Sequence, residues 1–191
     1  MLTEESTMKS VDKIAKVVSK VLEIVHFVAA ALMGTAAVCA LVVPQYIGYF
    51  VEFEPAENVV ELETYGFEVT AVVSNGMPDM MVFSLFAVAS CIILLLMALV
   101  FRNIYSIIRK SEESTPFQKD NVRMLKEIGI FSIAVPAVGF VMGIIIQIVA
   151  GFDAVEISNS MTGFIMGIIV LCLTQFFAHG VELEDDVEGL L

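Results

Sequence analysis

Charged side chains are scarce in this sequence, and four long stretches contain none at all. Only 17% of the 191 residues are Asp, Glu, Lys or Arg, whereas 58% are hydrophobic. So few charges cannot cover the surface of a soluble globule of this length, which excludes an ordinary soluble domain. The uncharged stretches are residues 24–43, 80–101, 128–150 and 161–178.

These uncharged stretches have the length of membrane-spanning helices. At 1.5 Å per residue each covers about 27–35 Å, close to the hydrocarbon thickness of about 30 Å. In lipid every backbone N–H and C=O needs an internal partner, so the stretches are expected to be helical. The sequence therefore predicts an all-α integral membrane protein, a four-helix transmembrane bundle forming one domain over residues 1–191. The predicted spans are residues 21–43, 80–101, 128–150 and 161–178.

Lysine and arginine are absent from residues 44–79 and 151–160. All ten lie either before the first predicted span or in the connection at residues 102–127. The positive-inside rule then places the N-terminus, that connection and the tail at residues 179–191 in the cytoplasm, as in a multi-pass protein of the cell membrane. The net charge of −12 excludes direct nucleic-acid binding through phosphate contacts.

Cysteine pairs and catalytic motifs are also missing. Cys39, Cys91 and Cys172 fall in three different predicted spans without CxxC spacing, and are expected to be small packing residues. The chain has no GxSxG, HExxH or Walker sequence. We therefore predict no catalytic residue, no metal and no cofactor, and we do not expect an enzyme.

Residues 8–20 are predicted to form an amphipathic helix before the first span. Apolar residues and four lysines each recur at helical spacing there. The segment either anchors the first span or lies on anionic lipid.

The acidic connection at residues 44–79 is predicted to lie outside the cell and to contain a β-hairpin. Residues 59–64 and 67–73 alternate and flank Tyr65-Gly66. Its seven carboxylates have no counter-charge, so it either binds a cation or basic ligand or is simply solvated. Residues 151–160 are expected to be a short outer loop.

The connection at residues 102–127 contains a helix-start signal. Thr115 is predicted to be the N-cap, Pro116 the first helical residue and Gln118 the reciprocal capping-box residue. The helix should continue into the third span, with residues 109–114 as a flexible joint before it.

Two glycine pairs predict a contact between the third and fourth spans. Gly139 and Gly143 lie four residues apart, as do Gly163 and Gly167. Counted from the cytoplasmic ends, Gly139 matches Gly167 in depth and Gly143 matches Gly163. Close antiparallel packing through these four helix-packing residues is therefore expected, with Gly129 outside the contact.

Few polar residues lie inside the predicted spans. His26 is one of them, and proton-relay chemistry there would need a carboxylate within the bundle, which we do not expect.

Two segments resemble those of a known family. Residues 114–129, STPFQKDNVRMLKEIG, and residues 176–191, FFAHGVELEDDVEGLL, resemble the hallmark loop and the ending of DUF2975, a family of small prokaryotic membrane proteins. The resemblance implies a four-span domain of unknown biochemical function with no catalytic residues. It also implies a signalling context, since members are often encoded beside a helix-turn-helix regulator.

The favoured function is a non-enzymatic sensory or regulatory module that acts on a cytoplasmic protein. By family analogy that partner is a helix-turn-helix regulator, and the lipid bilayer and further copies of the chain are the other expected partners. The alternative is a subunit of a small transporter, channel or exporter. Opposite charges on the loop helix and the tail suggest that the tail docks on the loop in one state. The expected partner contacts are Lys119, Arg123, Lys126, Glu184, Asp185 and Asp186.

Overall fold

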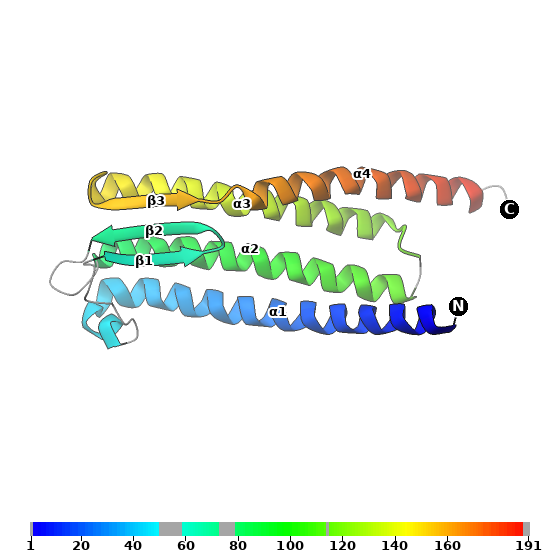
Figure 1. The fold of residues 1–191 in the computed structure, drawn as a ribbon, viewed down its shortest axis with the longest axis horizontal. Helices are drawn as coiled ribbons and strands as arrows, with labels where there is room; N and C mark the ends of the chain where they lie inside the picture. Colours follow the sequence, from blue (N-terminus) through cyan, green and yellow to red (C-terminus); the bar gives the residue numbers. More distant parts are fainter. Residues whose placement is uncertain (1, 50–58, 73–78, 114, 189–191) are drawn as a thin grey trace. The chain divides into compact units, whose positions relative to one another are not determined.

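A computed structural model describes the chain except for residues 1, 50–58, 73–78, 114 and 189–191 (Figure 1). The side chains of residues 2–10, 46, 48, 49, 72, 113, 185 and 188 are likewise outside the description. The helices are α1 (Leu2–Val42), the short 3-10 helix η1 (Pro44–Tyr49), α2 (Met80–Glu113), α3 (Lys119–Ala150) and α4 (Thr162–Glu188). The strands are β1 (Val59–Thr64), β2 (Phe67–Val72) and β3 (Val155–Asn159).

Four helices are long and apolar enough to cross a membrane. Their candidate spans are Val11–Val42, Met80–Glu112, Lys119–Ala150 and Thr162–Glu184, with 32, 33, 32 and 23 residues. Outward-facing positions of these helices are rich in large apolar side chains, as expected where lipid rather than water is the surrounding solvent. The predicted fold class is therefore confirmed, and the chain fits a multi-pass membrane protein.

The helices continue well beyond the uncharged stretches. The predicted amphipathic helix at residues 8–20 and the predicted span at residues 21–43 form one helix, α1. No Gly or Pro separates Met8 from Met33, so nothing in the backbone breaks the helix there. The flexible joint predicted at residues 109–114 is also wrong, because α2 continues to Glu113.

The chain divides into two compact units. Unit 1 comprises Met1–His26, Leu96–Ile133 and Gly163–Leu191, and unit 2 comprises Phe27–Leu95 and Ala134–Thr162. All ten Lys and Arg belong to unit 1. Unit 2 contains nine acidic residues and no basic one, so the charge asymmetry in the sequence coincides with this division.

Unit 2 contains a small antiparallel sheet of order β1-β2-β3. The predicted hairpin is confirmed, since Thr64 pairs with Phe67 across a turn formed by Tyr65 and Gly66. Both turn residues have positive φ, 51° and 77°, as a tight two-residue hairpin requires. Residues 155–159, expected to belong to a loop, instead form β3, which pairs with β2 from Phe67↔Asn159 to Ala71↔Val155.

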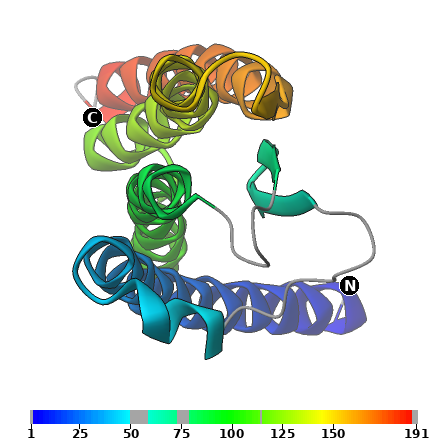
Figure 2. The ribbon, with the colours of Figure 1, turned by 90° about the vertical axis from the view of Figure 1, so that its left-hand side faces the viewer.

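One face of the sheet packs on helices of unit 2. Phe67 is buried and its ring stacks on Phe86 of α2 with ring centroids 5.8 Å apart. Thr64 and Ser90 share a hydrogen bond of 2.9 Å between their hydroxyls. Figure 2 shows η1 beside the end of α1, where Ile47 joins a buried apolar cluster with Ala40 and Phe83.

Gly139 and Gly143 lie against this sheet and not against the fourth helix, so the predicted pairing is wrong for them. A Cβ at Gly139 would lie 2.8 Å from Oδ1 of Asn159, and one at Gly143 would lie 2.9 Å from Cγ2 of Ile157. The side chain of Asn159 also donates a 2.7 Å hydrogen bond to the carbonyl of Pro136. The two glycines therefore let β3 lie directly against α3.

Helices α3 and α4 do meet at a glycine contact in unit 1, but the partner is different. A Cβ at Gly167 would lie 2.7 Å from the carbonyl oxygen of Gly129, and one at Gly129 would lie 3.1 Å from that of Gly167. Gly129, expected to be outside the seam, is thus at its centre, whereas Gly163 is half-buried in the first turn of α4. The predicted depths are wrong because β3 runs back along α3. The first residue of α4, Thr162, is close to the predicted one, but the helix begins farther along α3 than a short loop would place it.

Candidate functional site: the α2–α3 turn and the end of α4

The turn between α2 and α3 is organised by one buried side chain, Asn121. Its amide nitrogen donates to the carbonyl of Pro116 at 3.1 Å and to the hydroxyl of Ser111 at 3.4 Å. Lys110 and Asp120, on either side of the turn, form an ion pair of 2.5 Å. These contacts join the end of α2 to the start of α3 across residues 115–118.

The predicted helix cap is not formed. α3 begins at Lys119, and its first described backbone bond runs from the N–H of Val122 to the carbonyl of Gln118. Gln118 therefore occupies the cap position, and Pro116 lies in the turn instead of the first helical turn. Thr115 does not cap the helix, and its hydroxyl instead donates a hydrogen bond of 3.1 Å to the carboxylate of Glu184. A tertiary partner has replaced the local one.

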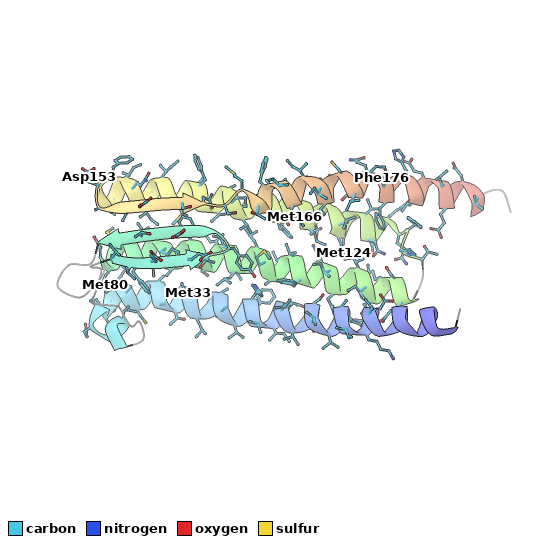
Figure 3. The ribbon with its side chains drawn as sticks, in the orientation of Figure 1. Met33, Met80, Met124, Asp153, Met166 and Phe176 are labelled. Carbon is cyan, nitrogen blue, oxygen red and sulfur yellow. The ribbon has the colours of Figure 1, made fainter. Side chains whose placement is uncertain are left out.

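The end of α4 packs on this turn through three contacts. Besides the bond from Thr115 to Glu184, the ring of Phe117 lies 5.7 Å from that of Phe177. Phe117 also lies directly over Gly180, where a Cβ would be 2.5 Å from the ring. We call this set of residues the turn–tail contact: Thr115, Phe117, Phe177, Gly180 and Glu184. The adjacent Phe176 points away from it and is 72% exposed (Figure 3).

The residues expected to contact a partner differ in how far they are exposed. Lys119, Arg123, Lys126 and Asp186 are exposed, whereas Glu184 is half-buried. Arg123 pairs with Glu127 of its own helix at 3.7 Å. The side chain of Asp185 lies outside the described residues. In the contacts described for the turn, the tail is held by a hydroxyl and an aromatic ring, which sequence reasoning on charge did not anticipate.

A second polar layer lies on α1, facing α2 within unit 1. Glu23 and His26 are both buried, at 8% and 7% exposure, and lie one helical turn apart. Lys20 pairs with Glu23 at 2.9 Å and places its ammonium over the ring of Tyr105. The expectation that no carboxylate lies within the bundle is therefore wrong, because Glu23 is buried there. The missed signal is the spacing of Ser19, Glu23, His26 and Ala30, which marks one face of a helix.

The polar layer continues from α2 to α3. Asn103 of α2 donates a 3.0 Å hydrogen bond to the carboxylate of Glu127 of α3. Between α1 and α2, the ring of His26 lies against that of Phe101 in a tilted arrangement, with ring centroids 5.0 Å apart and an interplanar angle of 43°. Lys16 and Glu112 form a further ion pair between α1 and α2. Among the described residues there is no group of three or more His, Cys, Asp or Glu side chains that could hold a metal ion.

Comparison with known families agrees with the two motifs in the turn and the tail. The family described as "Protein of unknown function (DUF2975)" matches residues 35–189. The chain belongs to this family. The turn–tail contact lies within the matched region, so its two halves are the two DUF2975 segments recognised in the sequence. Neither the curated proteins nor the solved structures gave a match.

Proposed function

We propose that this DUF2975 protein is a non-enzymatic regulatory module of the cell membrane that acts on a cytoplasmic protein through the turn–tail contact. One observation carries the proposal: Thr115 and Phe117 of the α2–α3 turn bind Glu184 and Phe177 near the end of α4. Two segments separated by about sixty residues thus form a single surface on unit 1.

The proposed orientation places this surface in the cytoplasm. Lys110, Lys119, Arg123 and Lys126 surround the turn, and unit 2 has no basic residue. Basic residues near helix ends are retained on the cytoplasmic side during insertion. A cytoplasmic protein could therefore reach the turn and the tail, and an acidic segment would be attracted to the exposed Arg123 and Lys126.

The strength of the turn–tail contact suits a reversible switch. An exposed hydrogen bond to a carboxylate contributes about 1 kcal/mol, and an aromatic pair contributes about 0.5–1.5 kcal/mol. A total of roughly 1.5–2.5 kcal/mol leaves the open form populated at about 1–7%. A partner that binds Phe117 once its ring is released from Phe177 would then stabilise the open form.

The proposal is tested with the full-length protein in mild detergent, followed by mass spectrometry of the proteins that co-purify. Phe177→Ala weakens the contact and should increase the recovery of the partner several-fold, because less free energy is needed to open it. Phe176→Ala is the matched control, since it removes the same ring from the neighbouring, exposed position. Equal recovery with the two variants would contradict the role of the contact.

The alternative function, a transporter or channel subunit, is favoured by the buried Glu23 and His26. Buried ionisable residues in a membrane domain commonly line ion or proton pathways. Glu23→Gln would then abolish ion flux in reconstituted vesicles without changing the co-purifying proteins. Flux equal to that of empty vesicles for both the wild-type protein and the variant would exclude this alternative.

A further inference from the structure

Helix α1 carries an apolar stripe that repeats every seven residues. Its members alternate at intervals of three and four residues, and their exposed fractions lie between 48% and 66%: Val11, Ile14, Val18, Val21, Val25, Val28 and Leu32. Seven such positions cover three heptads. A strict 3.5-residue repeat keeps its apolar side chains aligned only along a partner helix that winds around it.

The part of the stripe that belongs to unit 1, from Val11 to Val25, faces away from the rest of that unit. The face of α1 that contacts α2 is formed by Lys16, Lys20, Glu23 and His26, which bind Glu112, Tyr105 and Phe101 of α2. Val11 and Val18 lie seven residues apart and are core positions of this repeat. Lys16 and Glu23 also lie seven residues apart, at the position on the side of the helix opposite to the core. The apolar stripe and the polar layer therefore lie on opposite sides of one helix.

Lipid alone cannot cover the whole stripe. The apolar length of α1, Val11–Val42, contains 32 residues, which corresponds to about 48 Å as a helix and exceeds the hydrocarbon thickness of about 30 Å. A tilt of about 20° shortens this length only slightly. Lys13, Lys16 and Lys20 mark the N-terminal end as the part outside the hydrocarbon. Since α1 is one continuous helix, that end cannot lie flat on the bilayer while the remainder crosses it.

We propose that α1 pairs with α1 of a second copy of this chain, as a parallel coiled coil that begins outside the membrane and continues into it. Both copies insert in the same orientation, so a two-fold axis along the membrane normal brings each core position to its equivalent. The residues flanking the core carry no charge: Ala15 and Leu22 on one side, Val17 and Ile24 on the other.

The uncharged flanks are the reason for choosing an identical chain as the partner. In coiled coils the flanking positions usually carry the charges that select a different partner or oppose self-pairing. Here Lys13 and Lys20 occupy positions outside the flanks, and Lys16 pairs within its own chain with Glu112. The flanking positions therefore carry no charges that would repel a second copy of α1 or select a different partner. The small Ala15 side chain also permits close approach of the helices. This inference is independent of the function proposed above.

Cysteine cross-linking in native membranes tests the geometry. On a background without Cys39, Cys91 and Cys172, the conservative variants Val18→Cys and Val21→Cys should oxidise to a disulfide-linked dimer. Lys13→Cys, exposed on the same helix but outside the stripe, should remain monomeric. Equal cross-linking at the stripe and at Lys13, or none at either stripe position, would overturn the proposed pairing.

The mass of the full-length protein in mild detergent tests the energetics. The wild-type protein should be dimeric, and Val18→Glu should weaken self-association tenfold or more because two carboxylates would meet at the core. Val187→Glu places the same charge at an exposed apolar position of α4 and should leave the dimer intact. A monomeric wild-type protein, or a dimer insensitive to Val18→Glu, would refute the α1 pairing.

Discussion

The glycine contact between α3 and α4 allows one chemical change to be compared at two positions. Gly167→Ala adds a methyl group whose carbon would lie 2.7 Å from the carbonyl oxygen of Gly129 and 3.1 Å from the backbone nitrogen of Ile133. Ordinary contacts of such a carbon begin at 3.4 Å. Both atoms belong to the backbone of α3, so a side-chain rotation cannot relieve the overlap. The helices must move apart instead.

The magnitude follows from two opposing effects. Replacing glycine by alanine inside a helix stabilises it by about 0.5–1 kcal/mol, because alanine loses less conformational entropy. Overpacking against a rigid neighbour costs about 1–3 kcal/mol, and a separation of 0.5–1 Å weakens the surrounding dispersion contacts by a quarter to a half. Gly167→Ala should therefore lower the free energy of unfolding by up to about 2 kcal/mol.

Gly34→Ala is the matched control, because its added carbon would lie 3.4 Å from Sγ of Cys91, an ordinary contact. This variant should be neutral or stabilised by up to about 1 kcal/mol. Thermal unfolding in detergent measures the difference, which should be roughly 1–3 kcal/mol in favour of Gly34→Ala. Equal unfolding temperatures for the two variants would mean that α3 and α4 do not touch at Gly167.

Three further predictions concern topology and the sheet. A single cysteine at Asp153 should react with an impermeant maleimide in intact cells, whereas one at Asp186 should react only after permeabilisation; the reverse pattern would invert the proposed orientation. Gly66→Ala should destabilise the fold in detergent by at least about 1–3 kcal/mol, because φ is 77° and the new carbon would lie 2.5 Å from Cβ of Ser160; an unchanged unfolding temperature would contradict this turn geometry. Asn159→Leu should cost about 1–2 kcal/mol by removing the bond to Pro136, and a variant as stable as wild type would show that β3 is not held there.

Some features of this protein were predictable because they depend on local pattern. Uncharged blocks of about twenty residues can satisfy their backbone in lipid only as helices, so four spans followed directly from composition. The hairpin at Tyr65-Gly66 was predictable as well, since alternating strands and a short glycine turn are signals within a dozen residues. Family membership depended on two segments that can be read without any structure, and the comparison with the family agrees with both.

Other features required knowledge of which segments meet. Gly139 and Gly143 have the spacing of a helix–helix contact, and that spacing indicates only that something approaches closely; β3 takes the place expected for a helix. Thr115 fits a cap by sequence, yet its hydroxyl binds Glu184, nearly seventy residues away. A local cap and a distant carboxylate differ by about 1 kcal/mol or less, so sequence alone does not choose between them.

Sequence alone also did not predict where α4 lies along α3. Residues 151–160 read as a loop, and a loop would have set α4 at the depth expected from counting residues. Because Val155 and Ile157 instead pair with β2, the chain returns along α3 before α4 begins, and Gly167 meets Gly129 rather than Gly139. Helix periodicity and hydropathy fixed which segments are helices. The registers between those helices depend on hydrogen bonds and close contacts between residues far apart in the chain, which no local pattern contains.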